Sequence, residues 1–350
     1  VYKRQVDLSA FQIFEASGTG ALEYVDKMVV NKCDVQVGKS IYTPVLNESG
    51  GFRSDLTIVR LQENLFRIIT GAFDGARDEY WFRSHLPADA SVILENKTNA
   101  ICTFGVWGPK AVDLLSTVTE SKLDQEKFPY GTSQSLLVEG LPVDMLRISY
   151  VGDAGFEIYT GTQHGLALWD ALWEAGKHYD LRPIGAAVYG TSGRLEKGYR
   201  LMGSELENEY NPVEAGLDRN KVKAADFIGK TAYVEARAIK QVAQLCALTM
   251  DSNKCSAGYE RFPTGSGNEP ILTLEGDRIL DNKGRISRVT TAGNAPSIGK
   301  YVLLAYLPID KCIPGTALQV LYQNKLYPIT VAATGRNLSL YDSEDSRMRC

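Results

Sequence analysis

The 350-residue chain has few of the side chains on which metal and nucleophile chemistry depends. Its six cysteines form no CxxC pair and stand at no zinc-ligand spacing from a histidine. Its three histidines, His85, His164 and His178, fall on predicted amphipathic helices or at their ends, where surface and packing roles are common. These shortages argue against a zinc site, give no support to a serine hydrolase triad, and favour reduced thiols in a reducing compartment.

Nucleotide-binding motifs are missing as well. Residues 38–40 (GKS) and 229–231 (GKT) end like a P-loop, but the glycine required upstream is Cys33 in the first and Ala224 in the second. Residues 18–20 (GTG) lack the third glycine and the preceding long strand of a dinucleotide-binding fold. The sequence therefore predicts no nucleotide site of either kind, and any flavin must lie elsewhere.

The chain also lacks long apolar runs and an excess of positive charge. No apolar stretch approaches the ~20 residues of a membrane-spanning helix, and the N-terminus has no apolar signal-peptide core. The net charge of -4 offers no general attraction for nucleic acid. We therefore expect a soluble protein of the cytoplasm, or of the mitochondrial matrix in a eukaryote, with neither a membrane nor a nucleic-acid partner.

Helix and strand patterns are both present, without a regular βαβ period, which predicts an α+β protein. Apolar residues at helical spacing predict helices over residues 20–30, 74–86, 109–115, 165–177 and 231–239. Strand patterns cover residues 40–46, 55–61, 64–70, 91–94, 101–107, 134–138, 142–150 and 156–160. Over residues 241–329 short strands alternate with Gly, Pro and Asn, which predicts a small β-barrel.

Residues 1–5 (VYKRQ) differ from the strand pattern that starts at Val6. That strand begins without a lead-in turn or cap, and the pentapeptide is similar to a translated sequencing adapter. We expect residues 1–5 to be foreign to the protein and exclude them from the predicted fold.

Two acidic residues stand close to glycine-containing turns. Asp55 lies in residues 50–57 (GGFRSDLT), just after a glycine pair, where an acid commonly hydrogen-bonds a loop. Glu157 ends residues 149–157 (SYVGDAGFE) inside an apolar strand, so it is either exposed on a polar face or buried with a partner. Each acid alone has an ordinary structural explanation.

Residues 194–200 (RLEKGYR) form the third notable motif. Read alone, they predict a helix whose Arg194 and Glu196 form an ion pair on a solvated face. Read after the other two motifs, they place an arginine within possible reach of the same ligand as two acids. That combination suits a polar, partly anionic heterocycle.

The ordered combination resembles the glycine cleavage T-protein family, the aminomethyltransferases. The resemblance rests on residues 42–57, 149–158, 194–200, 211–217, 226–230 (DFIGK), 294–300 (NAPSIGK) and 340–349. It runs from about Val6 to the end of the chain. Within the family the chain is most similar to the folate-binding half of dimethylglycine and sarcosine dehydrogenases and oxidases, because Ser54 and Asp55 provide one acid where glycine cleavage enzymes have two.

The resemblance implies an α+β fold with three domains in a cloverleaf around a central folate channel, the last a small β-barrel. The implied divisions are a folate-binding domain of two subdomains over residues 6–222, a linker and helix over 223–240, the barrel over 241–337 and a tail over 338–350.

The resemblance also assigns roles to single residues. Asp55 matches a catalytic aspartate beside the reactive edge of the folate, where a carboxylate can accept or position a proton. Glu157 matches a glutamate that accepts hydrogen bonds from the pterin ring, and Arg194 matches an arginine that contacts the folate. The remaining implied cofactor contacts are the pocket-lining Tyr42 and Tyr150 and the tail residue Tyr341. No metal ligand is implied.

The implied activity is one-carbon transfer to tetrahydrofolate. In the leading interpretation the unit comes from an N-methyl amine such as dimethylglycine or sarcosine, and FAD belongs to a domain or partner subunit outside this chain. Two alternatives stay open: a free-standing tetrahydrofolate-dependent methyltransferase, demethylase or aminomethyltransferase, and a non-catalytic folate-binding module.

Overall fold

The structure, a computed structural model, describes residues 4–250 and 268–349. Its strands are β1 (Arg4–Asp7), β2 (Gln12–Ser17), β3 (Ser40–Leu46), β4 (Phe52–Gln62), β5 (Leu65–Thr70), β6 (Ile93–Asn96), β7 (Ile101–Trp107), β8 (Ser133–Val138), β9 (Leu141–Leu146), β10 (Gly155–Gly161), β11 (Arg182–Pro183), β12 (Ala243–Met250), β13 (Ile271–Leu272), β14 (Val289–Ala295), β15 (Lys300–Pro308), β16 (Ala317–Tyr322) and β17 (Lys325–Thr334). Its α-helices are α1 (Ala21–Met28), α2 (Gly75–Ser84), α3 (Ala111–Leu115), α4 (Gly165–Gly176), α5 (Arg194–Glu196) and α6 (Lys230–Ala238). Among the described residues, no helix is long and apolar enough to cross a membrane.

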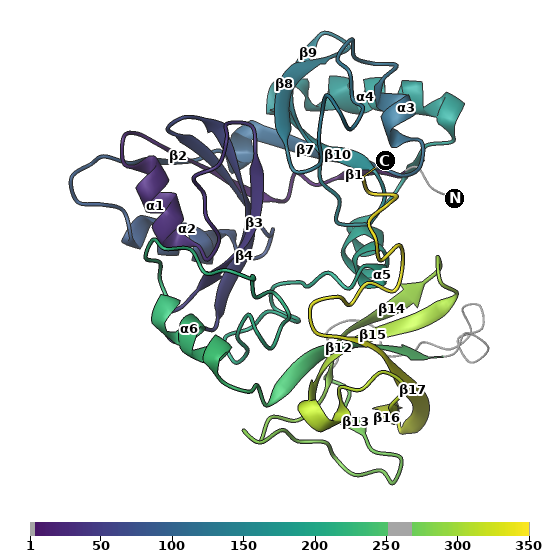
Figure 1. Cartoon of the computed structure of the whole chain (residues 1–350). Coiled ribbons are helices and arrows are strands. Elements are labelled where there is room, and N and C mark those ends of the chain that lie inside the picture. The colour runs from purple at the N-terminus through teal and green to yellow at the C-terminus, as the bar shows by residue number, and fades with distance from the viewer. Residues whose placement is uncertain (1–3, 251–267, 350) are drawn as a thin grey trace.

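The strands form three sheets, each in its own lobe, with α5 near the centre (Figure 1). The first sheet has the order β3-β4-β5-β2-β6 and the second the order β11-β1-β7-β10-β9-β8. The third, β13-β16-β17-β12-β15-β14, is built from the C-terminal part of the chain. The predicted α+β fold with a C-terminal barrel domain is confirmed, although residues 251–267 of the predicted barrel lie outside the described residues.

Helices cover the outer faces of the first two sheets. On the first sheet, α1 and α2 bury apolar side chains such as Phe82, and on the second, α3 and α4 bury side chains such as Leu168. The opposite faces of these sheets meet each other, where Ile69 of β5 packs in one cluster with Leu146 and Tyr159 of the second sheet. The two sheets therefore form a continuous support for residues on their shared side.

A further apolar cluster ties the three lobes together. It contains Phe52 of β4, Leu195 of α5, Tyr233 of α6 and Leu245 of β12, all fully buried. Full burial of four large side chains contributes about 1.5–3 kcal/mol each, so this junction stabilises the arrangement of the lobes. The predicted domain borders at residues 222, 240 and 337 stay predictions.

The N-terminal strand includes two residues that we expected to be foreign. Arg4 and Gln5 lie in β1, and Gln5 is fully buried opposite Val106 of β7. These two residues therefore take part in the second sheet. A foreign origin for residues 1–5 stays a prediction, and residues 1–3 lie outside the described residues.

The predicted helix over residues 194–200 is only partly correct. A π-helical turn, Val188–Gly193, leads directly into the short α5. The chain leaves the helix at Lys197, and Gly198 has a φ of +64°. A left-handed residue cannot continue a right-handed helix, so the second half of the motif is a turn followed by an irregular connection.

Candidate functional site

A hydrogen-bonded pair, Tyr42 and Asp55, lies on the hairpin of β3 and β4. Tyr42 is opposite Thr57 and Pro44 is opposite Asp55, so the two polar side chains project from the same face. Tyr42 Oη donates to Asp55 Oδ2 at 2.8 Å. The phenol thus orients the carboxylate, while 38% of the Tyr42 surface stays exposed on the same side.

A glycine pair makes this hairpin possible. Gly50 has a φ of +82°, and a Cβ on Gly51 would lie 2.2 Å from the Asn208 carbonyl oxygen. Only glycine fits both positions, because one needs the left-handed region and the other a close backbone approach. The predicted glycine turn is confirmed, and it sets the position of Asp55 four residues later.

The surroundings raise the pKa of Asp55 to about 6. Enclosure by protein atoms is the largest cause of this pKa rise, although part of the side chain reaches solvent. The hydrogen bond from Tyr42 lowers the pKa, whereas the negative charges of Asp74 and Asp78 raise it. A carboxyl group with this pKa can exchange a proton close to neutral pH.

Asp78 is a buried acid behind the hairpin that the sequence analysis missed. It is 1% exposed and accepts hydrogen bonds from Ser54 Oγ at 2.6 Å and Thr70 Oγ1 at 2.5 Å. Arg53 Nη1 lies 3.9 Å from its other carboxylate oxygen. Its burial could have been inferred from its position on α2, one turn before the buried Phe82 and on the same helix face.

Glu157 lies on β10 and is 3% exposed, so the buried alternative is correct. The hydroxyl of Tyr159, two residues along the same strand face, donates to Glu157 Oε2. Burial raises the pKa of Glu157 to about 7, against the lowering effect of this hydrogen bond. Glu157 is therefore a strong acceptor above neutral pH and a neutral group below it.

A cluster of tyrosine rings connects the two acids. The ring of Tyr150 lies 5.2 Å from that of Tyr189 and stacks on Tyr199 at 5.8 Å. Burial raises the pKa of Tyr150, and the negative charge of Asp55 raises it further. Burial likewise raises the pKa of Tyr189, and the negative charge of Glu157 adds to that rise. The structure thus brings Tyr42, Asp55, Tyr150 and Glu157 to one region bordered by aromatic rings.

Arg194 has no exposed surface, and its guanidinium is surrounded by protein acceptors. Nε donates to Gly190 O at 2.8 Å, and Nη1 donates to Tyr199 O at 2.9 Å. Nη1 also donates to Glu205 Oε2, and Nη2 to Thr291 Oγ1, both at 2.7 Å. These bonds use four of the five guanidinium hydrogens, so a ligand contact has at most one hydrogen left.

Glu196 and Arg200 are buried as well, so Glu196 does not lie on a solvated helix face as predicted. Arg194 pairs with Glu205, while Glu196 Oε1 accepts a hydrogen bond from Ser297 N at 2.8 Å. Arg200 Nη2 donates to Gly335 O at 2.7 Å. The RLEKGYR motif therefore joins the N-terminal lobes to the C-terminal one.

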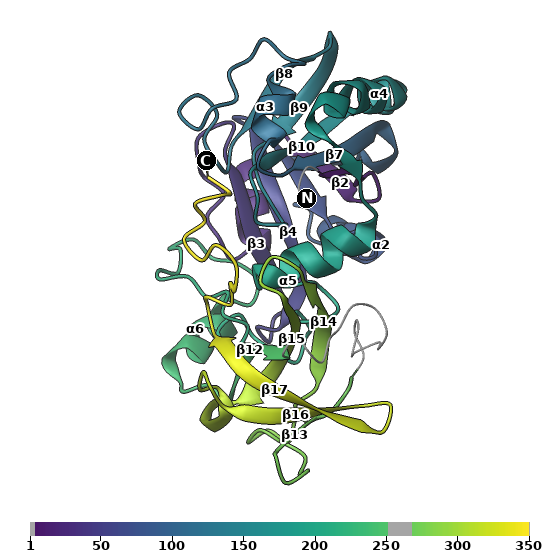
Figure 2. The ribbon, with the colours of Figure 1, turned by 90° about the vertical axis from the view of Figure 1, so that its right-hand side faces the viewer.

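Lys197 fastens the C-terminal tail. Its buried Nζ donates to Asp342 O and to Asp345 Oδ1, both at 2.7 Å, and to Tyr341 O at 3.3 Å. A Cβ on Gly152 would lie 2.6 Å from the Lys197 side chain, so the glycine of the second motif admits the lysine of the third. Both views show the tail running from β17 past α5 towards the second lobe (Figures 1 and 2).

Tyr341 lies at the base of this tail, where its backbone N donates to Glu196 O at 3.1 Å. The tail reaches the ring cluster further along: Tyr199 Oη bonds Met348 Sδ at 3.5 Å, and the Arg349 guanidinium lies 5.6 Å from the Tyr130 ring centre. The tail therefore reaches the aromatic cluster through Met348, which contacts Tyr199. A contact of Tyr341 with a ligand stays a prediction.

A surface hollow of about 580 Å³ lies at the junction of the first two sheets, beside Tyr159 and Arg67. Arg67 Nη1 donates to Asp144 Oδ2 across this junction at 2.8 Å. Neither Asp55 nor Glu157 lines the hollow, and its arginine is already paired. The chemistry therefore favours the region of the two acids as the functional site. Across residues 4–250 and 268–349, no cluster of three or more His, Cys, Asp or Glu could hold a metal ion.

Two known domains together match most of the chain. Residues 4–223 match the GCVT N-terminal domain, and residues 262–335 match the glycine cleavage T-protein C-terminal barrel domain. The chain belongs to the glycine cleavage T-protein family. The predicted membership is confirmed, and with it the prediction of an aminomethyltransferase-like one-carbon transferase.

Relatives of the family differ in how much of their length the chain covers. An aminomethyltransferase of Saccharopolyspora erythraea is 31% identical over 93% of this chain and 84% of its own length. The mitochondrial dimethylglycine dehydrogenase of Homo sapiens is 29% identical over 93% of this chain but only 36% of its own length. The aminomethyltransferase T structure from Bartonella henselae has the same fold, with a TM-score of 0.81, 21% identity, and coverage of 98% of this chain and 87% of that one.

Proposed function

We propose that the chain binds tetrahydrofolate between Asp55, the tyrosine cluster and Glu157, and that it receives a one-carbon unit from an N-methyl amine such as dimethylglycine or sarcosine. The observation that carries the proposal is the oriented Asp55 carboxyl group, with its pKa of about 6, on the same side as exposed Tyr42. This arrangement suits proton transfer at a bound heterocycle.

The residues present fit the folate. Glu157 is a buried acceptor beside aromatic walls, and a pterin offers adjacent N-H donors on a flat ring. Tyr150 and Tyr189 provide faces against which such a ring can pack. Tetrahydrofolate, when bound, supplies the nucleophilic nitrogen that takes up the one-carbon unit.

Asp55 has the catalytic role in this proposal. Its carboxylate accepts a proton or holds it in position beside the reacting nitrogen, and Tyr42 keeps the carboxylate oriented. The rings around it and the tail above them exclude water that would otherwise release the unit as formaldehyde. Glu157, Arg194, Tyr150, Tyr42 and Tyr341 are the proposed cofactor contacts.

The proposed donor implies a flavin-containing partner. Oxidation of an N-methyl amine needs an electron acceptor, and we propose FAD on a domain or subunit outside this chain. The match to only 36% of a dimethylglycine dehydrogenase supports this view, because such a relative has a large additional part. The single acid at Ser54 and Asp55 also favours an amine-derived donor.

The second candidate is a free-standing aminomethyltransferase. The match to 84% of the Saccharopolyspora erythraea enzyme favours it, because little of that relative is left unmatched. The two candidates differ in the donor: a free N-methyl amine with a flavoprotein, or an aminomethyl group on a carrier. Turnover assays with each donor separate them.

Calorimetric titration with tetrahydrofolate tests the shared claim. We expect saturable binding, and no heat at high micromolar ligand would contradict both candidates. The Asp55→Ala variant separates an enzyme from a module that only holds folate. We expect binding to persist and turnover to fall; unchanged turnover with intact binding would remove Asp55 from catalysis.

Arg194 is the least accessible of the proposed folate contacts, because it is fully buried and only one hydrogen, at Nη2, is not bonded to the protein. The Arg194→Lys variant distinguishes contact from support. Because the guanidinium also bonds four protein acceptors, the variant should melt at a lower temperature in either case, and a contact role predicts weaker tetrahydrofolate binding as well. A lower melting temperature with unchanged binding would assign Arg194 to support alone.

A further inference from the structure

Two cysteines of the C-terminal lobe lie together. Cys246 is on β12, and Cys312 follows the short turn after β15. Their sulfur atoms lie 3.5 and 3.8 Å from the same carbonyl oxygen, that of Gln244. The thiols also hydrogen-bond each other, and Thr334 Oγ1 lies 3.6 Å from the Cys246 sulfur. They are 66 positions apart in sequence, so the fold alone brings them together.

We propose that Cys246 and Cys312 form a dithiol site that a hydroperoxide oxidises to a disulfide. The chemistry is independent of the folate site and of the donor. Thiols in direct contact need little movement to bond, because disulfide formation depends on a close approach of the two sulfurs. The proposal goes beyond the expectation of reduced thiols, because it gives this pair an oxidised state.

The two thiols have different environments, which assigns them different steps. Cys246 is fully buried between β15 and β17, whereas Cys312 is half-buried. The hydrogen bond from Cys246 lowers the pKa of Cys312, against the raising effect of burial. Because it is more exposed and ionises more easily, Cys312 is the thiol that reacts first with the hydroperoxide.

The reaction balances in two steps. The Cys312 thiolate attacks one peroxide oxygen, the O-O bond breaks, and the remaining oxygen leaves with a proton as water or alcohol, giving a sulfenic acid on Cys312. The Cys246 sulfur then attacks the Cys312 sulfur, the S-O bond breaks, and water leaves with the Cys246 proton. Both sulfurs are oxidised and one peroxide is reduced.

The cross-link has a measurable structural consequence. It would connect β12 to the turn after β15 and close the intervening chain, including β13, β14 and β15. A closed loop restricts the unfolded chain more than the folded one, which raises the melting temperature. Gln244, whose carbonyl contacts both thiols, also donates Nε2 to Glu214 O at 2.8 Å, so the cross-link lies beside the lobe junction.

The experiment treats the full chain with hydrogen peroxide, blocks remaining thiols by alkylation, and maps peptides by mass spectrometry. We expect a Cys246-Cys312 peptide that dithiothreitol reverses, and a higher melting temperature of the oxidised protein. Cys312→Ser should remove both effects. Cys102→Ser, which changes another half-buried cysteine, should remove neither.

The Cys246→Ser variant tests the order of the steps. Without its partner, Cys312 should stop at the sulfenic acid, which dimedone labels. Two results would overturn the proposal: both thiols remaining alkylatable in the unmodified chain at peroxide doses that oxidise free glutathione, or Cys312 pairing with a different cysteine. Both are read from the unmodified protein, so neither depends on how well a variant folds.

Discussion

At the scale of single residues, burial adjusts the two acids in different ways. Asp55 keeps contact with solvent and has a pKa of about 6, whereas Glu157 is enclosed and has a pKa of about 7. A general base must be ionised to accept a proton, and a pterin acceptor must avoid the proton that would block its lone pair. Both requirements are better met as the pH rises past these values.

For Asp55 we predict a pH-dependent rate with a limb near its pKa. With tetrahydrofolate saturating, kcat should rise with pH through about 6 and then level off, because ionised Asp55 is the active form. Asp55→Asn should lower kcat by about 10²–10⁴-fold and abolish this limb. Stopped-flow or steady-state assays between pH 5 and 8 measure both effects.

Tyr42→Phe provides the matched control for this limb. The variant loses the hydrogen bond that lowers the pKa of Asp55, so the limb should move to higher pH while the plateau rate remains measurable. A limb that stays in place would show that another group controls the rate.

For Glu157 we predict a conflict between stability and binding. The pKa of Glu157 is about 7 in the folded chain and 4.5 in the unfolded chain. The folded state therefore favours the protonated side chain, and this contribution to stability is complete below about pH 4.5 and is lost as the pH rises through 7. Glu157→Gln should therefore raise the stability at pH 8 by on the order of 3 kcal/mol, since one pKa unit corresponds to ~1.4 kcal/mol. Little change is expected at pH 4.5.

Urea unfolding at the two pH values measures this difference in stability, and calorimetry measures the loss of tetrahydrofolate affinity. The same variant should bind tetrahydrofolate more weakly, because an amide replaces the carboxylate acceptor. A variant that is more stable and still binds normally would show that Glu157 does not contact the folate.

The identity of the motif residues could be predicted from sequence, but their partners could not. Arg194 stands in a recognisable motif, yet its acceptors Glu205 and Thr291 are 11 and 97 positions away. A buried ion pair and a solvated one look the same in sequence, because burial depends on segments that fold over the pair. The expected surface pair of Arg194 with Glu196 was therefore wrong.

At the scale of elements, the sequence pattern predicted an element correctly where the residues of one short segment determine its structure. The strand over residues 40–46 is β3 with the same ends, because alternation and a glycine turn act within a few residues. The helix over residues 194–200 was predicted too long, because the polar residues Glu196 and Arg200 are buried as well, so the segment does not have one apolar helix face.

The tail is an element that Lys197 holds through three acceptors, which leads to a further prediction. Lys197→Met should release residues 338–349, because three hydrogen bonds, one of them the ion pair with Asp345, are lost from a site that is 1% exposed. Hydrogen exchange of this segment should rise, and the KM for tetrahydrofolate should increase with kcat less affected.

The control for this variant is Lys177→Met. Lys177 pairs with Glu174 on an exposed helix end, where ion pairs contribute about 0–1 kcal/mol. It should leave tail exchange and KM unchanged. A Lys197 variant that keeps the tail protected would assign the tail's attachment to its other contacts, such as that of Met348 with Tyr199.

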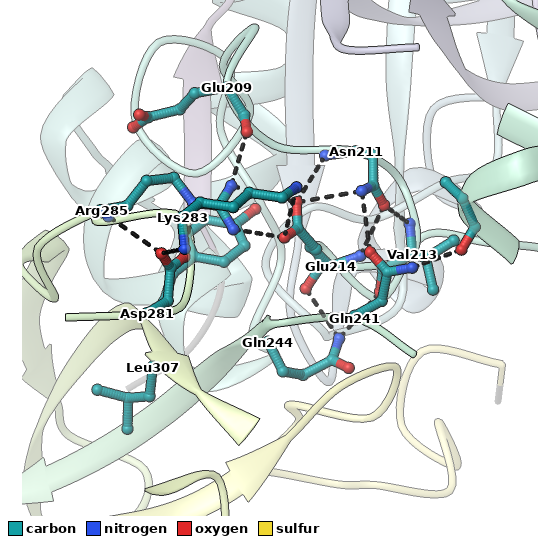
Figure 3. Close-up of polar contacts among 12 residues, drawn as sticks. Glu209, Asn211, Val213, Glu214, Gln241, Gln244, Asp281, Lys283, Arg285 and Leu307 are labelled. Atoms are coloured by element: carbon teal, nitrogen blue, oxygen red, sulfur yellow. Dashed lines mark hydrogen bonds and ion pairs between the residues drawn. The ribbon is translucent and has the colours of Figure 1, made fainter. Parts of the chain in front are cut away.

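At the scale of the whole molecule, the arrangement of the lobes rests on pairs that sequence patterns do not reveal. The family resemblance predicted the α+β fold and barrel, which are confirmed. The contacts that join the lobes are long-range: Glu214, inside a family motif, is fully buried and meets Arg285 of the C-terminal lobe (Figure 3). Only the folded chain shows that these two residues face each other.

This junction supports a final prediction. Arg285 Nη2 lies 2.5 Å from Glu214 Oε1, and Nε lies 2.6 Å from Asp281 Oδ2, while its guanidinium lies 4.4 Å from the Tyr210 ring centre. Arg285→Met removes the nearest cation from two buried carboxylates, of which Glu214 keeps only Lys283 at 3.8 Å, so the free energy of unfolding should fall by about 3–5 kcal/mol. Adding Glu214→Gln to this variant should recover part of the loss, because it removes one of the stranded charges.

Arg336→Met is the matched control, since Arg336 also joins the C-terminal lobe to the chain before α6, through Asp218, but is 52% exposed. Its loss should cost at most about 1 kcal/mol. Thermal unfolding of the unmodified chain, Arg285→Met, Arg336→Met and the double variant measures these differences in stability. Equal losses for Arg285→Met and Arg336→Met would mean that burial adds nothing to the Glu214 pair, and the lobes would then depend on the apolar cluster around Leu195 and Leu245 for their arrangement.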